Sequence, residues 1–437
     1  MENKNNFRKV FIVGVGMTKF LKPGSHELSY IELGSLAVRR ALNDSSLKYT
    51  DVESAYVGYV FNESCAGQRV LYEVGMTGIP VVNLNNNCAT GSTAFNMAYN
   101  SVKAGLTDCS LALGFDQMKP GPLPMDATVK THPVFKHIEP LIVEKKFNSK
   151  IPGAPQQFGA AGLEHMKKYG TTHDQICNIS VKNYSHGVNN PYAQFRKEYT
   201  CKQVADSKMI TYPLTKLNCC PTSDGAAANI VCSESFVKAH GLENQAVEVL
   251  SSVLGTDKNS TFDNKSDISL IGYDLCKSVA EKALKEAKIT INDVNVIELH
   301  DCFSANELIT YEGLGLCKQG EAGKFIDNKD NTYGGKFVVN PSGGLTSKGH
   351  PLGATGLAQL TELAWQLRGM SEKRQVKNAK YALAHNLGLG SAVVITILKK
   401  YNDNYKRKSD QTSDPDLLEK FESEKVDNNS NSLFPKF

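Results

Sequence analysis

The sequence has no Cys-x-x-Cys pair among its 11 cysteines, and their spacing follows no regular pattern. This excludes the usual zinc-finger and disulfide frameworks and is typical of a reducing intracellular compartment. Long apolar runs are also missing: the N-terminal run ends before Gly16, and no stretch approaches the roughly 18 residues that span a bilayer. Charge of one sign is scarce, because the net charge is +4 over 437 residues. We expect no transmembrane segment, no metal and no nucleic-acid partner.

A nicotinamide site is not indicated either. Gly14–Gly16 follows the apolar strand candidate Val10–Val15, as the turn of a dinucleotide-binding fold would. The third glycine of that fingerprint is missing, and no following strand ends in an acidic residue at the required distance. The remaining composition, with 41% apolar and 22% charged residues, is that of an ordinary globular protein with room for two or three domains.

The segment Asn83–Gly105 is where we expect a thiol nucleophile. Its second part has small and apolar residues at helical spacing, and the β-leaning Gly78–Val82 precedes it. Cys88 stands between the two, where the helix dipole is expected to lower the pKa of its thiol. Unpaired N–H groups of the first helical turn would also stabilise an oxyanion. Taken alone, Cys88 fits a buried structural cysteine as well as a nucleophile.

An internal repeat links the two halves of the chain. Ser35–Tyr59 aligns without gaps with residues 277–301, at an offset of 242 positions. Cys88–Gly91 aligns with His350–Gly353 at an offset of 262. Leu111–Gly114 then aligns with Ala382–His385 at 271, which leaves nine extra residues in the second copy. Two matches in the same order indicate a duplicated βαβ-type half. A pseudo-twofold axis would bring the helix starts at Cys88 and His350 to one site.

The repeat sets the expected domain organisation of this α/β chain. Residues 1–118 and 215–255 form the N-terminal half, and residues 256–400 form the C-terminal half. The irregular segment 119–214, rich in Pro, Gly, Lys and Tyr, is expected to be an inserted loop domain covering the site. The polar segment 401–437 is expected to be a flexible tail with a weak helical patch over Asp416–Phe421.

Histidines and a second cysteine stand at strand–loop junctions of the second half. His300–Phe303 follows the strand candidate Val294–Leu299, at the strand end where open α/β sheets place ligands. Gly349–Gly356 opens a helix with a histidine, and His385–Ser391 follows a further strand candidate. Each stretch alone is as well explained by packing. Three histidines and two cysteines at such junctions of a duplicated fold favour a catalytic site.

With these motifs in place, the chain resembles the SCP2-type (sterol carrier protein X-like) 3-oxoacyl-CoA thiolases of the thiolase superfamily, from about Val10 to Lys400. Most thiolases carry an NEAF-type stretch and a CxG-type stretch. In this chain HDCF takes the place of the first and HNLG that of the second, which is the SCP2-type pattern. The resemblance implies a five-layer αβαβα fold of two similar halves with an inserted loop domain. It is carried by the segments NNNCATGS, FGAAGLEHMKKYG, NNPYAQF, CCPTSDGAAA, IELHDCFSANELITYE, DNTYGGK, NPSGG, SKGHPLGATGLAQ and HNLGLG.

The resemblance also implies a chemistry. A thiolase cleaves the C2–C3 bond of a 3-oxoacyl-CoA with CoA as co-substrate and with no permanently bound cofactor. Cys88 would attack the C3 carbonyl after His350 takes its proton. Cys302 is the candidate acid for the departing enolate and the candidate base for the incoming CoA.

Two oxyanion holes are expected, because both half-reactions build negative charge on oxygen. His350 and His300 would hold the enolate oxygen. The N–H of Cys88 and that of Leu387 or Gly388 would hold the acyl oxygen. His385 replaces the usual catalytic cysteine of its stretch, and its role is open. The sequence does not identify the residues that bind CoA.

Two other functions fit part of this pattern. Ketoacyl-synthase-like condensing enzymes combine one cysteine with two histidines, but decarboxylation needs no acid/base thiol such as Cys302. A catalytically silent lipid- or acyl-CoA-binding protein would have no reason to keep the cysteines and histidines together. The stretch after Lys400 is too short for the lipid-transfer domain of the resembled protein, so no sterol-transfer activity is expected.

Assembly and location are expected from the resemblance alone. Thiolases are at least dimeric, so we expect a homodimer. The family is largely peroxisomal, although Pro435–Phe437 is not a serine-lysine-leucine type tripeptide. The cytosol and the mitochondrion therefore stay open as alternatives.

Overall fold

The computed structural model describes residues 7–25, 27–121, 137, 139, 143–148, 150–389, 392–403, 405 and 413–416. Its main feature is a sheet made of two equivalent sets of five strands. The first set runs in the order β1 (Val10–Met17), β7 (Gly225–Ser233), β4 (Cys109–Asp116), β2 (Ser54–Gly58), β3 (Val81–Leu84). The second runs in the order β8 (Val247–Gly255), β12 (Ala392–Lys400), β11 (Tyr381–Gly388), β9 (Val296–Glu298), β10 (Val338–Val339).

The strand directions repeat as well as the order. In each set the second strand is antiparallel to both of its neighbours, and the last three strands are parallel. The sets join where β1 pairs antiparallel with β8, with Val10 opposite Val249. This repetition confirms the duplication predicted from the sequence offsets. The predicted domain ends stay a prediction; β8, assigned to the N-terminal half, is bonded to strands of both sets.

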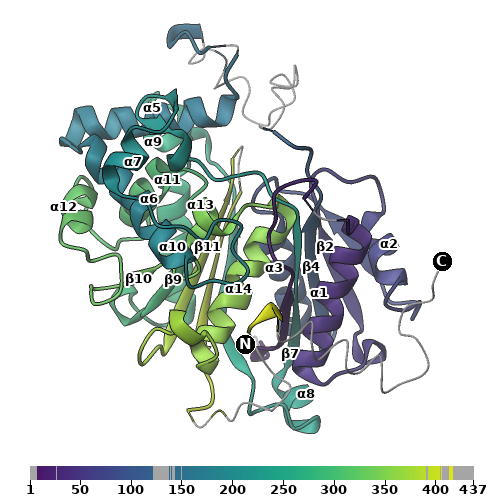
Figure 1. Ribbon diagram of the computed structural model, residues 1–437. Coiled ribbons are helices and arrows are strands. Elements are labelled where there is room, and N and C mark those ends of the chain that lie inside the picture. Colours follow the sequence, from purple (N-terminus) through teal and green to yellow (C-terminus); the bar gives the residue numbers. More distant parts are fainter. Residues whose placement is uncertain are drawn as a thin grey trace.

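Helices form three layers around the two sets of strands (Figure 1). The helices α3 (Thr90–Lys103) and α14 (Leu352–Arg368) lie between the sets and contact strands of both. On the outer faces, α1 (Tyr30–Ser45) and α2 (Ala66–Tyr72) belong to the first half, and α10 (Tyr273–Ala287) and α11 (Ser304–Gly313) to the second. The result is the five-layer αβαβα fold that the resemblance implies.

Burial of the helices follows their layer. Every residue of α14 is buried, as expected for a helix covered on all sides. The outer helix α1 begins at the capping box formed by Ser29 and Glu32, and only one face of it is buried.

The inserted region covers one end of the second half (Figure 1). Its helices include α5 (Gly153–Tyr169) and α6 (His173–Gly187). Remaining elements are α7 (Cys201–Ala205), β5 (Met209–Thr211), β6 (Leu214–Thr215), α8 (Glu234–Ala239), α9 (Asp267–Leu270), α12 (Ala322–Asp327) and α13 (Gly344–Lys348). Short 3-10 turns are η1 (Tyr49–Asp51), η3 (Lys216–Asn218), η4 (Asn259–Phe262), η5 (Ile291–Asp293) and η6 (Glu372–Arg374).

One expectation about a single segment was wrong. His385–Gly388 was expected in a loop after a strand, but it lies in β11, because each of its residues faces a partner on β12. Of the expected tail, Tyr401 packs edge-on against Phe11, and the patch beyond Asp416 lies outside the described residues.

The central helices approach each other through glycines. A Cβ added at Gly91 would lie 2.5 Å from the carbonyl oxygen of Gly353, and one at Gly356 would lie 2.4 Å from the amide nitrogen of Ser92. Real Cβ atoms do not approach backbone atoms so closely, so the two helix starts touch through their main chains. This contact places the N-termini of α3 and α14 side by side, as the pseudo-twofold axis predicted.

We expect Gly353→Ala to lower the free energy of unfolding by about 3 kcal/mol or more. Its new Cβ would lie 2.4 Å from the oxygen of Phe115 and 2.7 Å from that of Gly58, and neither backbone can move without disturbing its strand. Urea unfolding monitored by circular dichroism measures the change. Gly153→Ala is the matched control, because it meets only the end of Gln157 at 4.0 Å. Equal midpoints for Gly353→Ala and the wild type would contradict the contact.

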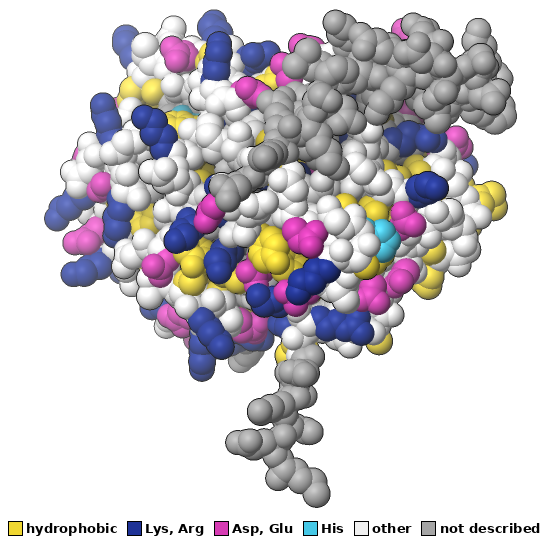
Figure 2. All heavy atoms as spheres, turned by 90° about the horizontal axis from the view of Figure 1, so that it is seen from below, with side chains coloured by type: hydrophobic (Ala, Val, Ile, Leu, Met, Phe, Trp, Pro, Cys, Tyr) yellow, Lys and Arg dark blue, Asp and Glu magenta, His cyan; other side chains and the backbone are white. Residues whose placement is uncertain are grey.

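The surface carries charges of both signs. On the face shown in Figure 2, Lys and Arg alternate with Asp and Glu, and hydrophobic side chains form small groups between them. That mixture agrees with the small net charge of +4. Within the described ranges, no helix is both long and apolar enough to span a membrane.

Candidate active site

Cys88 lies in the turn between β3 and α3, two residues before the helix begins. The turn is held by its own polar side chains: the Asn86 N–H donates to Thr90 Oγ1 at 2.8 Å, and Asn87 Nδ2 donates to the Leu389 carbonyl at 3.0 Å. The second bond ties the turn to the end of β11. Cys88 is therefore held by contacts with both halves of the molecule.

His350 stands in the equivalent place of the second half, between α13 and α14. The peptide before it requires glycine, because Gly349 has φ +112° and its Cβ would lie 2.5 Å from Ser223 Oγ. The same hydroxyl oxygen accepts the His350 N–H at 3.0 Å. The ring is oriented by Thr355, whose Oγ1 lies 2.7 Å from Nδ1.

His300 follows β9 and is buried. Its Nδ1 lies 2.9 Å from Nδ2 of Asn386 on β11. The N–H of His300 donates to Nδ1 of His385 at 3.4 Å. His385 thus contacts the main chain of the HDCF stretch, and its ring is not part of the cluster around Cys88.

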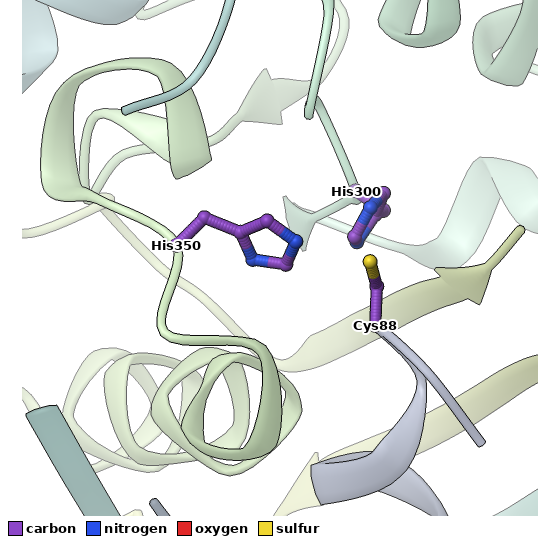
Figure 3. Close-up of side chains that lie close together, drawn as sticks. All are labelled: Cys88, His300 and His350. Carbon is purple, nitrogen blue, oxygen red and sulfur yellow. The ribbon is translucent and has the colours of Figure 1, made fainter. Parts of the chain in front are cut away.

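The structure brings Cys88, His300 and His350 together (Figure 3). The Cys88 sulfur and one ring nitrogen of each histidine all lie within 4.8 Å of one another. The two imidazoles meet edge to face, with ring centroids 5.0 Å apart. Three segments far apart in the sequence thus converge on one small volume, as the repeat predicted for Cys88 and His350.

The hydrogen bonds assign different tautomers to the two imidazoles. The Thr355 hydroxyl donates to the Pro351 carbonyl at 2.9 Å, so its oxygen accepts from His350 Nδ1–H. His350 Nε2 therefore carries a free lone pair. The Asn386 amide nitrogen only donates, so His300 Nδ1 is the acceptor and Nε2 carries the proton. Neither Nε2 atom has a hydrogen-bond partner among the residues that the structure describes.

Burial keeps these rings neutral at ordinary pH. It lowers the pKa of His350 and of His385 to about 3. The pKa of His300 falls well below its usual range, through burial and then through the neighbouring imidazoles. The cluster therefore offers one base, His350 Nε2, and one neutral donor, His300 Nε2–H.

The expected lowering of the Cys88 pKa is wrong. Burial, followed by the charge of Asp116, raises the pKa of this thiol to about 12. Cys88 precedes the helix and has neutral imidazoles beside it, so the dipole does not outweigh the loss of solvation. The resting thiol is protonated, and it needs a base in the site to become a nucleophile.

Cys302 is the second thiol of the site and is buried. Burial raises its pKa well above the usual value, and the charges of Cys220 and Cys88 act in the same direction. The Cys220 N–H donates to the Cys302 carbonyl at 2.9 Å, so the CCPTS segment runs beside HDCF. Cys302 is thus near Cys88 as a protonated thiol, which is the state of an acid.

The predicted backbone donors lie at the end of β11. A Cβ on Gly388 would lie 2.2 Å from the Asn86 oxygen and 3.1 Å from the Ala89 nitrogen. The main chain of Leu387 and Gly388 thus passes directly beside the Cys88 turn. Its role as an oxyanion hole stays a prediction.

Several supporting residues were not predicted from the sequence. Thr355 and Asn386 set the two tautomers, and Ser223 holds the His350 main chain. Asp301 accepts the N–H groups of Leu345 and Thr346 at 2.7 and 3.1 Å, which ties HDCF to the segment before His350. Burial, followed by the charge of Glu307, raises the pKa of Asp301 to about 7. Asp301 and Asn386 adjoin predicted site residues in the sequence, and Thr355 lies in the same stretch as His350, but no predicted site residue stands near Ser223 in the sequence.

Two family descriptions match most of the chain. "Thiolase, N-terminal domain" matches residues 10–235, and "Thiolase C-terminal domain-like" matches residues 257–400. Sterol carrier protein 2 of Homo sapiens is 54% identical over 394 residues, which cover 90% of this chain and 72% of that protein. Non-specific lipid-transfer protein-like 2 of Caenorhabditis elegans is 48% identical over 398 residues, 90% of this chain and 96% of that protein.

Solved structures show the same fold at low identity. An Ltp2-ChsH2(DUF35) aldolase superposes with a TM-score of 0.76 at 21% identity, over 90% of this chain and 98% of that chain. Human mitochondrial 3-ketoacyl-CoA thiolase in complex with CoA gives 0.66 at 17% identity, with the same coverage. These comparisons confirm the predicted fold and the resemblance read from the motifs.

Proposed function

The chain belongs to the thiolase family of acyltransferases, which use CoA as a substrate, and from this we propose that it is an SCP2-type 3-oxoacyl-CoA thiolase. It would cleave 3-oxoacyl-CoA with CoA into a shortened acyl-CoA and acetyl-CoA, or propionyl-CoA from 2-methyl-branched substrates. Its place would be the β-oxidation of fatty acids or sterol side chains. The observation that supports this most is the convergence of Cys88, His300 and His350, with Cys302 nearby.

In the first half-reaction, His350 Nε2 takes the proton of Cys88, and the thiolate attacks C3 of the substrate. The C2–C3 bond then breaks, leaving an acyl group on Cys88 and an acetyl-CoA enolate. His350 Nε2 now carries a proton, so both Nε2–H groups, its own and that of His300, donate to the enolate oxygen. Cys302 supplies the proton that C2 needs.

In the second half-reaction, the Cys302 thiolate takes the proton of the incoming CoA thiol. The CoA thiolate attacks the acyl carbon, the Cys88 thiolate leaves, and it takes back the proton that His350 Nε2 holds. The N–H of Cys88 and that of Leu387 or Gly388 stabilise the oxyanion of this step, since the two main chains lie side by side. His385 would act by holding the His300 main chain, through the N–H that its Nδ1 accepts.

CoA-dependent cleavage of a medium-chain 3-oxoacyl-CoA by the purified wild type tests the proposal. Consumption of the substrate, followed by loss of its enolate absorbance, should require CoA and produce acetyl-CoA in equal amount. A 2-methyl substrate run in parallel should produce propionyl-CoA. Decarboxylation without cleavage would favour a condensing enzyme. Binding of acyl-CoA without turnover would favour a catalytically silent binding protein. Either result would overturn the thiolase proposal.

The protein would act as a homodimer. The edge strand β3 has a sheet partner on one side only in the described part of the chain, and apolar side chains near it are exposed. Val82 is 44% exposed, Tyr72 53% and Met76 77%. An unpaired edge with such neighbours favours pairing with a second copy.

We expect sedimentation velocity of the wild type to show a dimer at micromolar concentration. Val82→Lys adds a charge to the exposed edge and should shift the population toward monomers. Leu106→Lys is the matched control, because Leu106 is also exposed but follows α3 at its far end. A monomeric wild type would contradict the dimer, and equal effects of both variants would contradict the β3 edge.

The peroxisome is the proposed location, on the strength of the relatives alone. Fluorescence microscopy of the full chain with an N-terminal tag, scored against a peroxisomal marker, tests it. A cytosolic or mitochondrial pattern would replace the proposal.

A further inference from the structure

The residues around Cys88 form a ready set of soft metal donors. One sulfur and two imidazole nitrogens lie within 4.8 Å of one another, and no other three His, Cys, Asp or Glu side chains of the described residues form such a group. Both imidazoles are buried, and their Nε2 atoms have no hydrogen-bond partner in the described part of the chain. Figure 3 shows the His350 ring pointing toward Cys88 and His300. Nothing in the thiolase chemistry above uses a metal.

The spacing suits a tetrahedral ion of zinc type. Bonds of about 2.0–2.1 Å to nitrogen and about 2.3 Å to sulfur place the ligand atoms of such an ion roughly 3.3–3.6 Å apart. Donor atoms that lie within 4.8 Å of one another need to close by roughly 1.2–1.5 Å at most to reach that spacing. Cys88 lies in the turn between β3 and α3 and is partly exposed.

The protons of the cluster also permit metal binding. His350 Nε2 already presents its lone pair, because Nδ1–H is held by Thr355. His300 needs the other tautomer, with the proton on Nδ1. If its amide turns, the Oδ1 of Asn386, which has no hydrogen-bond partner among the described residues, accepts a hydrogen bond from the Nδ1–H of His300. A metal-bound histidine normally has such a partner on its other nitrogen.

We propose that Cys88, His300 and His350 form a binding site for a divalent zinc-type ion, which inhibits the enzyme. The ion takes the Cys88 thiolate and releases its proton to solvent, and a water molecule completes the coordination. Nucleophile and base are then both occupied, so acyl transfer stops until the ion leaves. Thiolate and imidazole donors favour zinc and cobalt over magnesium and calcium, which prefer oxygen.

Titration with Co²⁺ tests the site without relying on turnover. Cobalt bound to a thiolate absorbs in the near ultraviolet, and tetrahedral cobalt gives intense visible bands. We expect about one such ion per chain in the reduced wild type, displaced by Zn²⁺ and unaffected by Mg²⁺. Cys88→Ser should abolish the charge-transfer band, and His350→Ala should weaken binding at least tenfold. Circular dichroism shows that each variant remains folded.

Two matched controls separate this site from other thiols. Cys302→Ala removes the neighbouring thiol, and Cys65→Ser removes an exposed one; both should retain the cobalt spectrum. Asn386→Asp should tighten binding about tenfold, since a carboxylate favours the Nδ1–H tautomer of His300. The proposal is overturned if the wild type gives no band, or if the band survives Cys88→Ser. A failed activity assay with an intact cobalt spectrum would instead count against the thiolase function alone.

Discussion

Replacing Cys88 by alanine should lower kcat/KM for CoA-dependent cleavage by about 10⁴-fold or more, the scale on which covalent enzymes lose activity with their nucleophile. No other thiol can substitute, because His350 Nε2 and the donors for the enolate oxygen converge on the Cys88 position. The acyl-enzyme intermediate should disappear too. Mass spectrometry of the protein after mixing with substrate in the absence of CoA measures it directly.

The control for this change is Cys65→Ser, which alters an exposed cysteine at the start of α2. It should retain the wild-type rate and the wild-type acyl-enzyme. Cleavage by Cys88→Ala within tenfold of the wild type would exclude Cys88 as the nucleophile. An acyl group mapped to another residue would also exclude Cys88 as the nucleophile.

Replacing Cys302 by alanine should lower the overall rate by about 10²- to 10⁴-fold, the usual contribution of a general acid or base. The effect should differ in kind from that of Cys88. The variant should still accept an acyl group on Cys88, since His350 activates that thiol. Transfer of the acyl group to CoA should be slow, because no group remains to take the proton of the CoA thiol.

Pre-acylated enzyme mixed rapidly with CoA, with the free acyl-CoA quantified over time, isolates this step. Cys220→Ala is the matched control: Cys220 lies beside Cys302, with its N–H bonded to the Cys302 carbonyl, but it has no role in the mechanism. It should transfer the acyl group within a few-fold of the wild-type rate. Fast transfer by Cys302→Ala, or slow transfer by Cys220→Ala, would move the acid/base role away from Cys302.

Much of the fold followed from local patterns. The helix after Cys88 and the strand before His300 are encoded by side-chain periodicity, which acts over a few positions. The repeat carried more information than any single element. Two helix starts at equivalent places of two halves must meet near the axis that relates the halves, so Cys88 and His350 could be placed together without coordinates.

The ends of strands and the polar residues that orient the site histidines were harder to predict from the sequence. His385–Gly388 looks like a glycine-containing loop, yet β12 supplies a partner for each of its residues and makes it a strand. Thr355 and Asn386 were passed over because nothing local distinguishes a threonine in a helix, or an asparagine in a strand, that orients an imidazole. Such roles depend on contacts between residues such as His300 and Asn386, which are 86 positions apart.

The sequence by itself determined the duplicated α/β fold, the family and the side chains proposed for the site, because periodicity and motif spacing are properties of the chain alone. Only the tertiary structure decided the chemical state of those side chains. Burial turned Cys88 from an expected low-pKa thiolate into a thiol with a pKa of about 12. The partners of the two imidazoles left a lone pair on His350 Nε2 and a proton on His300 Nε2. Solvation and hydrogen bonding depend on what surrounds a group, and distant segments supply those surroundings only when the chain has folded.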